Sequence, residues 1–228
     1  MNSKYEILYG HSFPVIRYNL NLGETLKAES DAMISMSATV DVTGGTEGGL
    51  LRGIARKLAG EKFFFQYLKA SRGPGEVILG HGIPGGIMDV ELDGSYSLVV
   101  QKDGFLAATE GIEINTTMQS LGRGLFSGEG FFVLEIKGRG IVFISSFGAI
   151  HIVNLEENQQ VIIDNGHLVA WPSYMKYHLE KASNGWISSF TSGEGLVCRF
   201  TGPGPVLIQT RNPLAFKEWL KKLGLSSR

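Results

Sequence analysis

The feature that most constrains the fold is a four-part pattern that occurs three times along the chain. Each copy consists of Gly-Glu, a short apolar run, Gly-x-Gly and a second apolar run, and the Gly-x-Gly elements begin at Gly73, Gly138 and Gly202. These three glycines are 65 and 64 residues apart. Runs rich in Val, Ile and Phe are typical of strands, and tight turns favour glycine because it tolerates positive φ. The pattern therefore predicts the same β-hairpin three times.

A second pattern alternates with the first. Val90-Glu91-Leu92 leads to Asp103-Gly104, and Val153-Asn154-Leu155 leads to Asn165-Gly166, each followed by another apolar run. Asp31-Ala32 takes the corresponding place near the N-terminus. Asp-Gly and Asn-Gly are strong hairpin signals because both residues of each pair accept left-handed geometry. Gly104 and Gly166 are 62 residues apart, close to the spacing of the first pattern.

Together the two patterns predict an all-β protein of three internally repeated antiparallel β-sandwich modules, at about 5–80, 85–145 and 150–210. A module of roughly four strands does not easily bury its own apolar face, so we expect one body over residues 1–228. The 31 glycines are spread through the strands and turns and are not gathered in a linker, which agrees with many tight turns.

Two segments carry the spacing of a helix. Apolar residues on one face between Leu50 and Leu58 predict a short helix near 49–59, ended by Gly60. A proline near its start and an amphipathic pattern predict a C-terminal helix near 213–223. We expect this helix to cap a sheet edge or to pack across the junctions between modules.

The remaining segments are assigned from local pattern. Residues 5–18 predict an initial strand and the first strand of the first module, and the alternation over 33–42 predicts one half-buried strand. Residues 116–127 are typical of a loop, and residues 174–184 fit either a turn of helix or an extended connection.

Charge, cysteine content and hydropathy exclude several classes of protein. The formal net charge of −1 gives no electrostatic basis for non-specific nucleic-acid binding. The single cysteine, Cys198, lies in an alternating run and cannot form an internal disulfide, so we expect it to be a buried apolar residue. No apolar leader follows Met1, and no run reaches the roughly 18 apolar residues of a membrane span. We therefore expect a soluble cytoplasmic protein with no transmembrane segment.

No pattern predicts catalytic chemistry. The chain contains neither Gly-x-Ser-x-Gly nor a cysteine with a nearby histidine. The repeated carboxylates Glu61, Glu129 and Glu194 each precede a strand, where accepting backbone N–H groups explains them better than acid–base work. We therefore predict no catalytic residue and no enzyme activity.

Cofactor and metal sites are also not predicted. The five histidines, His11, His81, His151, His167 and His178, include no His-x-His pair, so we expect structural or surface roles for them. The glycine-rich stretch 44–49 precedes a possible helix start but lacks the Lys-Ser/Thr of a phosphate-binding loop, and turn geometry explains its glycines better.

One basic face is a candidate partner surface. Arg52, Arg56 and Lys57 lie on the predicted helix near 49–59, away from its apolar face. Such a face either docks an acidic partner or an anionic surface, or is simply solvated, and three exposed charges support only weak, salt-sensitive binding.

A set of motifs carries a resemblance that spans nearly the whole chain. The motifs are Gly44-Gly45, Gly48-Gly49-Leu50-Leu51, Arg56, Gly60-Glu61-Lys62-Phe63-Phe64, Pro84-Gly85-Gly86-Ile87, Gly138-Arg139-Gly140, the run from Asp164 to Trp171, Gly202-Pro203-Gly204 and the run from Ile208 to Arg211. With them the chain resembles the bacterial family related to altered inheritance of mitochondria protein 24. The resemblance implies a β-sandwich of double-stranded β-helix type, similar to the tryptophan RNA-binding attenuation protein and repeated within the chain.

The resemblance implies no known activity, since the bacterial members are largely uncharacterised. The eukaryotic relative is associated with inner-membrane organisation in mitochondria, and that role transfers only as analogy. No basic motif in this chain matches the RNA-contacting motif of the attenuation protein.

Two functions remain open. Symmetric β modules leave strand edges that pairing between chains would cover, which favours a non-enzymatic assembly or scaffold protein that self-associates. The alternative is a small-ligand-binding module, or an enzyme of unrecognised type, with a pocket between the repeats.

Overall fold

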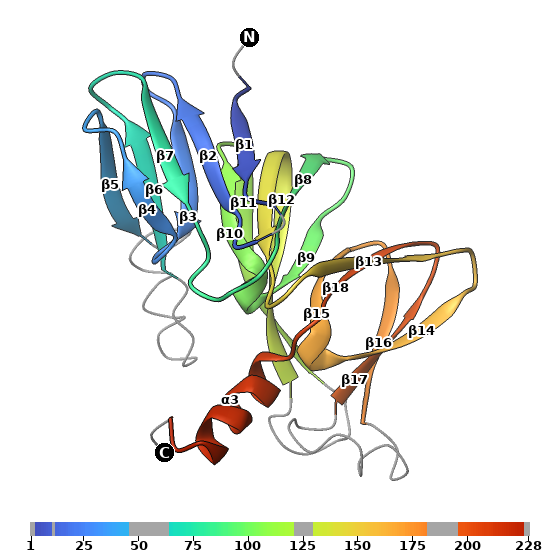
Figure 1. The fold of residues 1–228 in the computed structure, drawn as a ribbon. Helices are drawn as coiled ribbons and strands as arrows, with labels where there is room; N and C mark the ends of the chain where they lie inside the picture. The colour runs from blue at the N-terminus through green and yellow to red at the C-terminus, as the bar shows by residue number, and fades with distance from the viewer. Residues whose placement is uncertain (1–2, 11, 46–63, 121–129, 182–195, 226–228) are drawn as a thin grey trace.

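The computed structural model describes residues 3–10, 12–45, 64–120, 130–181 and 196–225 (Figure 1). Most of this part of the chain is β-strand. The strands are β1 (Tyr5–Leu8), β2 (Val15–Leu20), β3 (Thr25–Glu29), β4 (Met33–Met36), β5 (Val40–Gly45), β6 (Phe65–Ala70), β7 (Gly75–Leu79), β8 (Ile87–Asp93), β9 (Leu98–Gln101), β10 (Phe105–Thr109), β11 (Ile112–Ser120), β12 (Gly130–Ser145), β13 (Ile150–Leu155), β14 (Gln160–Asp164), β15 (Leu168–Pro172), β16 (Lys176–Lys181), β17 (Leu196–Thr201) and β18 (Gly204–Gln209). Two short 3₁₀ helices, η1 (Lys102–Gly104) and η2 (Asn165–His167), and the helix α3 (Pro213–Lys222) complete these elements.

Within the described residues the strands pair in three sheets. The largest follows the order β13-β18-β15-β9-β12-β10-β3-β6-β5, and β8 and β11 also pair with β12. The other two sheets have the orders β1-β2-β7-β4 and β14-β17-β16. Every strand pair is antiparallel. The prediction of a mainly β protein with antiparallel sheets and a C-terminal helix is confirmed.

One pairing scheme occurs in the N-terminal third (residues 5–79), the middle third (87–145) and the C-terminal third (150–209). In the N-terminal third, β7 pairs with β2 and β4, while β6 pairs with β3 and β5. In the middle third, the second half of β12 pairs with β8 and β10, and its first half pairs with β9 and β11. In the C-terminal third, β18 pairs with β13 and β15, and β17 pairs with β14 and β16. In each third the first four of these strands therefore alternate between two sets of paired strands, and the next strand in the chain pairs with the fourth. The superposition of three modules stays a prediction.

The Gly-x-Gly elements do not form the predicted hairpins. Among the described pairings, β6 and β7 on either side of Gly73 pair with other strands, as do β17 and β18 around Gly202, and β12 runs unbroken through Gly138. At these points the chain crosses from one layer to the other. At Gly138, φ is +117° and a Cβ atom would lie 2.1 Å from the carbonyl oxygen of Gly111. The prediction is wrong because a tight crossing requires glycine as strongly as a tight hairpin does.

The Asp-Gly and Asn-Gly signals also mark crossings. Asp103-Gly104 lies in η1 and Asn165-Gly166 lies in η2, and the strands that flank each of them pair elsewhere. At η2, the Asp164 carboxylate accepts a hydrogen bond from the Gly166 backbone N–H at 2.8 Å. These residues supply a compact turn in which the strand direction changes, without a two-stranded ribbon.

Three further segments refine the sequence assignments. The strand predicted over 33–42 is two strands, β4 and β5, separated by a turn in which the Val40 N–H donates to the Ser37 carbonyl oxygen. The loop predicted from residue 116 is wrong as far as Ser120, because β11 continues to that residue. Of the two possibilities for residues 174–184, β16 is extended. The predicted helix near 49–59 lies outside the described residues.

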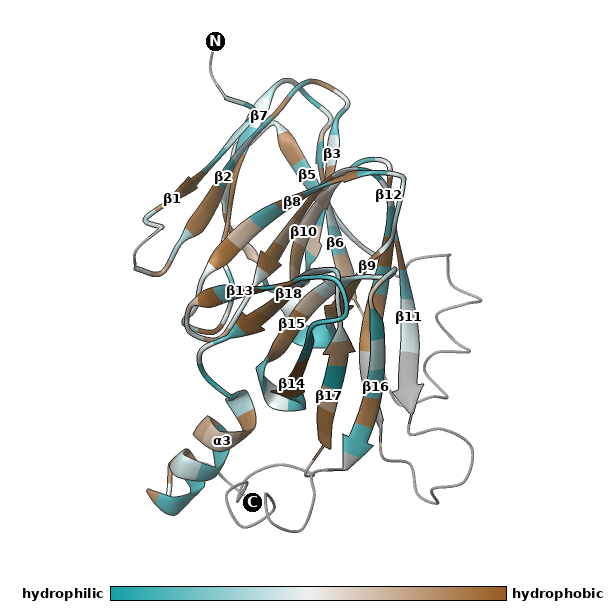
Figure 2. Ribbon diagram, turned by 90° about the vertical axis from the view of Figure 1, so that its right-hand side faces the viewer, coloured by the Kyte–Doolittle hydropathy of each residue, from teal (hydrophilic) through white to brown (hydrophobic). Residues whose placement is uncertain are grey.

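The three thirds share their apolar cores, and apolar and polar residues alternate along many strands (Figure 2). The core of the N-terminal third includes Leu106 and Phe143 from the middle third. The core of the C-terminal third likewise includes Val99 and Val133 from the middle third. Since neighbouring thirds bury side chains in one another, the described strands form one continuous packed body.

Helix α3 begins with a side-chain cap and leaves the sheets at the C-terminal end (Figure 1). The Asn212 side chain accepts hydrogen bonds from the N–H groups of Leu214 at 2.9 Å and Ala215 at 3.3 Å. Proline at the first helical position fits this start because its missing N–H is not needed there. The Phe216 ring contacts the ring of Phe147, between β12 and β13, with centroids 5.2 Å apart. No helix in the described part of the chain is long and apolar enough to cross a membrane.

Candidate functional site

Neighbouring thirds are joined by main-chain pairing between one strand of each. Strand β10 of the middle third pairs with β3 of the N-terminal third, and β15 of the C-terminal third pairs with β9 of the middle third. The first junction pairs Ala107 with Ala28, Ala108 with Lys27 and Thr109 with Leu26. The second pairs Ala170 with Val100, Trp171 with Val99 and Pro172 with Leu98.

Strand β4 has the same place in the N-terminal third as β10 and β15 have in the other two. All three strands carry an irregularity in register at one position, between Met33 and Ser35, between Phe105 and Ala107, and between Leu168 and Ala170. The irregularity falls at the same pairing position in all three strands, so their residues can be matched one to one from that position. Ser35 therefore corresponds to Ala107 and Ala170, and Met36 corresponds to Ala108 and Trp171.

Unlike its counterparts, β4 has an open outer edge. It ends the four-stranded sheet, and none of the described strands pairs with its second side. Ile34 is 59% exposed, whereas Leu106 and Val169 at the same position are 0% and 1% exposed. Met36 is 39% exposed, and its two counterparts are fully buried. An apolar strand edge with free N–H and C=O groups is a surface that pairs readily with another strand.

Strand β14 is the second open edge of this kind. It corresponds to β3 and β9, which both pair with a neighbouring third, but β14 ends the three-stranded sheet. Val161 and Ile162 are half-buried there, whereas Leu98, Val99 and Val100 on β9 are buried. By contrast, β5, β11 and β16 hold one equivalent place and are edges in all three thirds of the described structure, so an open edge there is ordinary.

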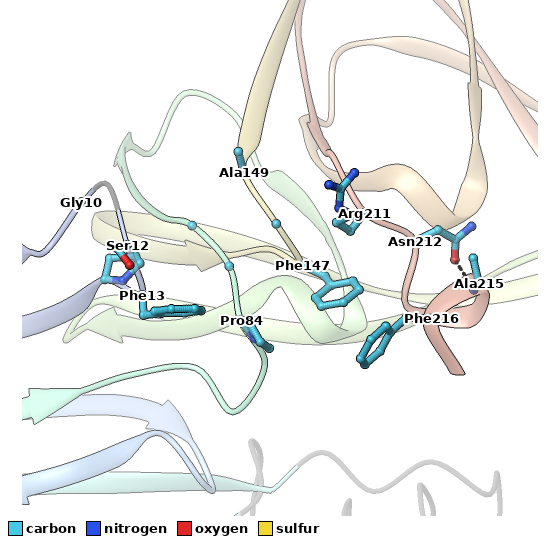
Figure 3. A pocket seen from close by; sticks show the side chains of 14 residues that line it. Gly10, Ser12, Phe13, Pro84, Phe147, Ala149, Arg211, Asn212, Ala215 and Phe216 are labelled. Atoms are coloured by element: carbon cyan, nitrogen blue, oxygen red, sulfur yellow. Dashed lines mark hydrogen bonds between the residues drawn. The ribbon is translucent and has the colours of Figure 1, made fainter. Parts of the chain in front are cut away.

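An apolar cleft of about 600 Å³ lies where the connections between thirds meet α3 (Figure 3). Main-chain hydrogen bonds join the connection before β8 to the connection before β13. The N–H of Gly148 donates to the carbonyl oxygen of Pro84 at 3.0 Å, and the N–H of Gly86 donates to the carbonyl oxygen of Gly148 at 2.7 Å. The connections approach so closely that a Cβ atom on Gly85 would lie 1.5 Å from the carbonyl oxygen of Ser146. The cleft is therefore a preformed feature of the backbone.

The described side chains of the cleft suit an apolar group and include no catalytic pair. Phe13, Phe147 and Phe216 contribute rings from three separate segments, and Arg211 lies beside Phe147 (Figure 3). Arg211 is the only charged residue among the described lining residues, which include no Asp, Glu or His. General acid–base catalysis needs titratable groups within hydrogen-bond reach of a reacting atom, and these walls do not supply them.

One titratable pair lies apart from the cleft mouth, between β3 and the end of β7. His81 Nε2 lies 3.9 Å from Glu29 Oε2. Burial raises the pKa of Glu29 to about 7, and the charges of Asp103 and Asp31 act in the same direction. Burial lowers the pKa of His81, against the opposing effect of Asp103. Both pKa shifts favour the uncharged forms of the two side chains. Within the described residues, no group of three or more His, Cys, Asp or Glu side chains is arranged to hold a metal ion.

The other candidates from the sequence occupy separate places. Cys198 is fully buried on β17, as predicted, and burial raises the pKa of its thiol to about 12, so it is not a ready nucleophile. His167 Nδ1 lies 2.7 Å from the carbonyl oxygen of Gln209, while His151 is exposed on β13. The proposed partner surface of Arg52, Arg56 and Lys57 lies outside the described residues. So do Glu61, Glu129, Glu194 and His11.

The sequence predicted open strand edges and, as an alternative, a pocket between the repeats, but it did not show that β4 and β14 are open or where the cleft lies. Met33-Ile34 aligns with two other apolar pairs, Phe105-Leu106 and Leu168-Val169, so the sequence signals a strand of the same kind in all three places. Whether such a strand has a neighbour depends on its place in the tertiary structure. The cleft is formed by turns and connections, and the sequence contains no periodic pattern that predicts which of these segments come together in space.

The class of protein is defined by this geometry: a multi-sheet antiparallel β protein whose thirds pair edge to edge. Comparison with known proteins identifies the family. The family model described as Mitochondrial biogenesis AIM24 matches residues 5–211, and the chain belongs to that family. The resemblance stated from the motifs is confirmed.

Two relatives from Streptococcus pyogenes support the assignment. An uncharacterized protein from serotype M6 is 30% identical over 219 residues, which cover 92% of this chain and 86% of the relative. An X-ray crystal structure of a protein from the same species matches with a TM-score of 0.79 and 29% identity, and covers 96% of this chain and 98% of that one. The crystal structure shows the same fold across nearly the whole chain, and the names of the two relatives state no activity.

Proposed function

We propose that this protein is a non-enzymatic assembly protein that self-associates through its strand edges. The observation that carries the proposal is the open edge of β4, where Ile34 and Met36 are exposed while their counterparts are buried. Covering such an edge removes apolar surface from water and satisfies main-chain hydrogen bonds, which both favour association.

The proposal treats the three thirds as copies of one unit, of the kind implied by the resemblance to the attenuation protein. The recurring pairing scheme and the shared irregularity in register support this interpretation. Superposing residues 15–79, 87–145 and 150–209 in an experimental structure tests it. If β2, β8 and β13 fell at unrelated positions, the three-unit interpretation would be wrong.

A non-enzymatic role is supported by the chemistry of the cleft. Its described lining offers apolar rings and one guanidinium group, without a nucleophile–base pair or a pair of carboxylates. The Glu29–His81 pair lies near the charges of Asp103 and Asp31, and burial favours the uncharged forms of both its members.

Sedimentation velocity tests self-association. We expect the wild-type protein to sediment at micromolar concentration as a species heavier than the 24.8 kDa chain. Met36→Glu should shift it towards the mass of one chain, because the charge would be buried in the contact. Ile152→Glu is the matched control, since Ile152 on β13 is 41% exposed and Met36 is 39% exposed. A wild-type protein that stays at the mass of one chain would contradict the proposal.

Small-ligand binding is a second candidate function, favoured by the preformed cleft. Its aromatic walls and single Arg211 suit an apolar molecule with an anionic end. Native mass spectrometry of the wild type and of Arg211→Ala, each mixed with dodecanoate as a probe, tests it. An adduct that is weaker in the variant would support the site, and equal adducts would contradict it.

A further inference from the structure

Strands β4 and β14, two of the open edges among the described strands, are the two halves of a junction that the chain already uses twice. In the internal junctions, β10 pairs with β3 and β15 pairs with β9. Strand β4 corresponds to β10 and β15, and strand β14 corresponds to β3 and β9. The spacing between the halves is constant, because three residues separate β3 from β4, β9 from β10 and β14 from β15. Each third thus carries one half of each type, and only the first and last thirds keep an unused half.

We propose that β4 of one copy of this chain pairs with β14 of a second copy, in the arrangement that joins the thirds within a chain. The inference rests on the proposed self-association and names its surface. A second copy is the occupant that the structure favours, because it supplies the missing half in the same form that β3 and β9 supply inside the chain.

The internal junctions give the register of the pairing. Ala107 pairs with Ala28 and Ala170 pairs with Val100, so Ser35 pairs with Ile163. By the same correspondence Met36 pairs with Ile162, and Ser37 pairs with Val161. The strands run antiparallel, as they do at both internal junctions.

The residue types fit this register. Ser35 is small, like Ala107 and Ala170 at the same position of the internal junctions. Met36 and Ile162 lie opposite each other and would share one face of the joined sheet, where their apolar side chains pack together. None of the six paired residues is charged, whereas edges that resist pairing are often protected by charge or proline.

The pairing is head to tail, so the surfaces that meet are different. After one contact forms, each pair of copies still has one free β4 and one free β14, so further copies can add, either until a ring closes or as a growing filament. A symmetric contact between two β4 strands would instead use a single surface twice. This difference can be tested directly.

Disulfide trapping between single-cysteine additions distinguishes the two arrangements. Residues opposite each other on antiparallel strands have Cα atoms about 4.5–5.5 Å apart, which suits a disulfide. Met36→Cys mixed with Ile162→Cys should cross-link under mild oxidation, and neither variant alone should do so. Met36→Cys mixed with Ile152→Cys is the matched control for random collision. The native Cys198 is fully buried, and wild-type protein shows whether it contributes.

Charge exchange tests the register without a covalent bond. Met36→Glu and Ile162→Lys should each weaken association when alone. In an alternating assembly of the two variants, every junction is either Glu opposite Lys or the original Met opposite Ile. Their mixture should therefore associate more strongly than either variant alone, while a mixture of Met36→Glu with Ile152→Lys should not.

The outcomes separate this inference from the proposed function. If wild-type protein remains a single chain, self-association and the β4–β14 pairing both fail. If it associates but Met36→Cys cross-links alone, or the mixture does not cross-link, the β4–β14 pairing is overturned and self-association stands. Thermal unfolding of each variant at low concentration confirms that the exposed substitutions leave the single chain folded.

Discussion

Replacing Gly138 by alanine tests why the middle strand β12 can cross from one layer to the other. Two physical effects act at this residue. Its φ of +117° is strained for any residue with a Cβ atom, and the added Cβ would lie 2.1 Å from the carbonyl oxygen of Gly111. That oxygen belongs to the backbone, so relief requires movement of the chain and not of a flexible side chain.

Three other glycines separate the two effects. Gly23 has a φ of +87° with nothing within 4 Å of the added Cβ, so Gly23→Ala carries the conformational effect alone. Gly202 has no such φ, but its Cβ would lie 2.2 Å from the carbonyl oxygen of Glu156, so Gly202→Ala carries the steric effect alone. Gly82 has neither feature and serves as the control.

The expected losses in the free energy of unfolding follow from these geometries. A positive φ destabilises an alanine by about 1–2 kcal/mol, partly offset by the reduced freedom of the unfolded chain. Forcing an extra carbon into a packed site costs about 1–3 kcal/mol. We therefore expect about 1 kcal/mol for Gly23→Ala, about 2 for Gly202→Ala and about 3 for Gly138→Ala, with almost no change for Gly82→Ala.

Urea unfolding followed by tryptophan fluorescence measures these differences. The ranking matters more than the absolute values, because the steric term depends on how far the backbone relaxes. If Gly138→Ala unfolded at the same urea concentration as Gly82→Ala, the crossing would not depend on glycine, and the explanation for the repeated Gly-x-Gly elements would be refuted.

Three further predictions concern single side chains. Because burial raises the pKa of Glu29 from 4.5 to about 7, the contribution of this carboxyl group to stability should be lost as the pH rises from 4.5 through about 7, while the lowered pKa of His81 acts in the opposite direction. Removing the Glu29 contribution with Glu29→Gln should therefore make the change in melting temperature between about pH 5 and pH 8 less negative than in the wild type, and equal slopes would contradict this. Burial raises the pKa of the Cys198 thiol to about 12, so this thiol should resist alkylation at pH 8 in the folded protein and react fully in urea. Rapid alkylation of the folded protein would contradict this prediction and show that the site opens. Asn212→Ala removes the side-chain cap and should destabilise helix α3 by about 1 kcal/mol, which would reduce the helical circular dichroism signal without moving the unfolding midpoint of the sheets. Asn212→Ser keeps a capping side chain and should behave as the wild type.

The sequence identified the strands better than their partners. The apolar runs around Gly138 and Gly202 are strands, because local composition and period determine extended structure. Their pairing was mispredicted because hydrogen-bonded neighbours lie far apart in sequence, as with Ile136 and Leu98. A glycine reports a special backbone angle or a close approach, but it does not report which strand makes that approach.

The site was less accessible to prediction for a similar reason. Ile34 belongs to an apolar run like those of Leu106 and Val169, yet it alone of the three is exposed. Its exposure follows from the lack of a preceding third that would supply a partner strand, a property of chain architecture and not of local sequence. The burial of Cys198 and the proline at the start of α3 were assigned correctly from their immediate neighbours.

The continuity of β12 has a consequence for how the protein opens. This one strand, Gly130–Ser145, pairs with β9 and β11 through its first half and with β8 and β10 through its second. The two layers of the middle third therefore cannot separate unless β12, which is hydrogen-bonded in both, loses its strand pairing in at least one of them. In native-state hydrogen exchange, amides in both halves, such as those of Leu134 and Val142, should exchange at a common slow rate set by global unfolding, with the middle third as the last cooperative unit to open.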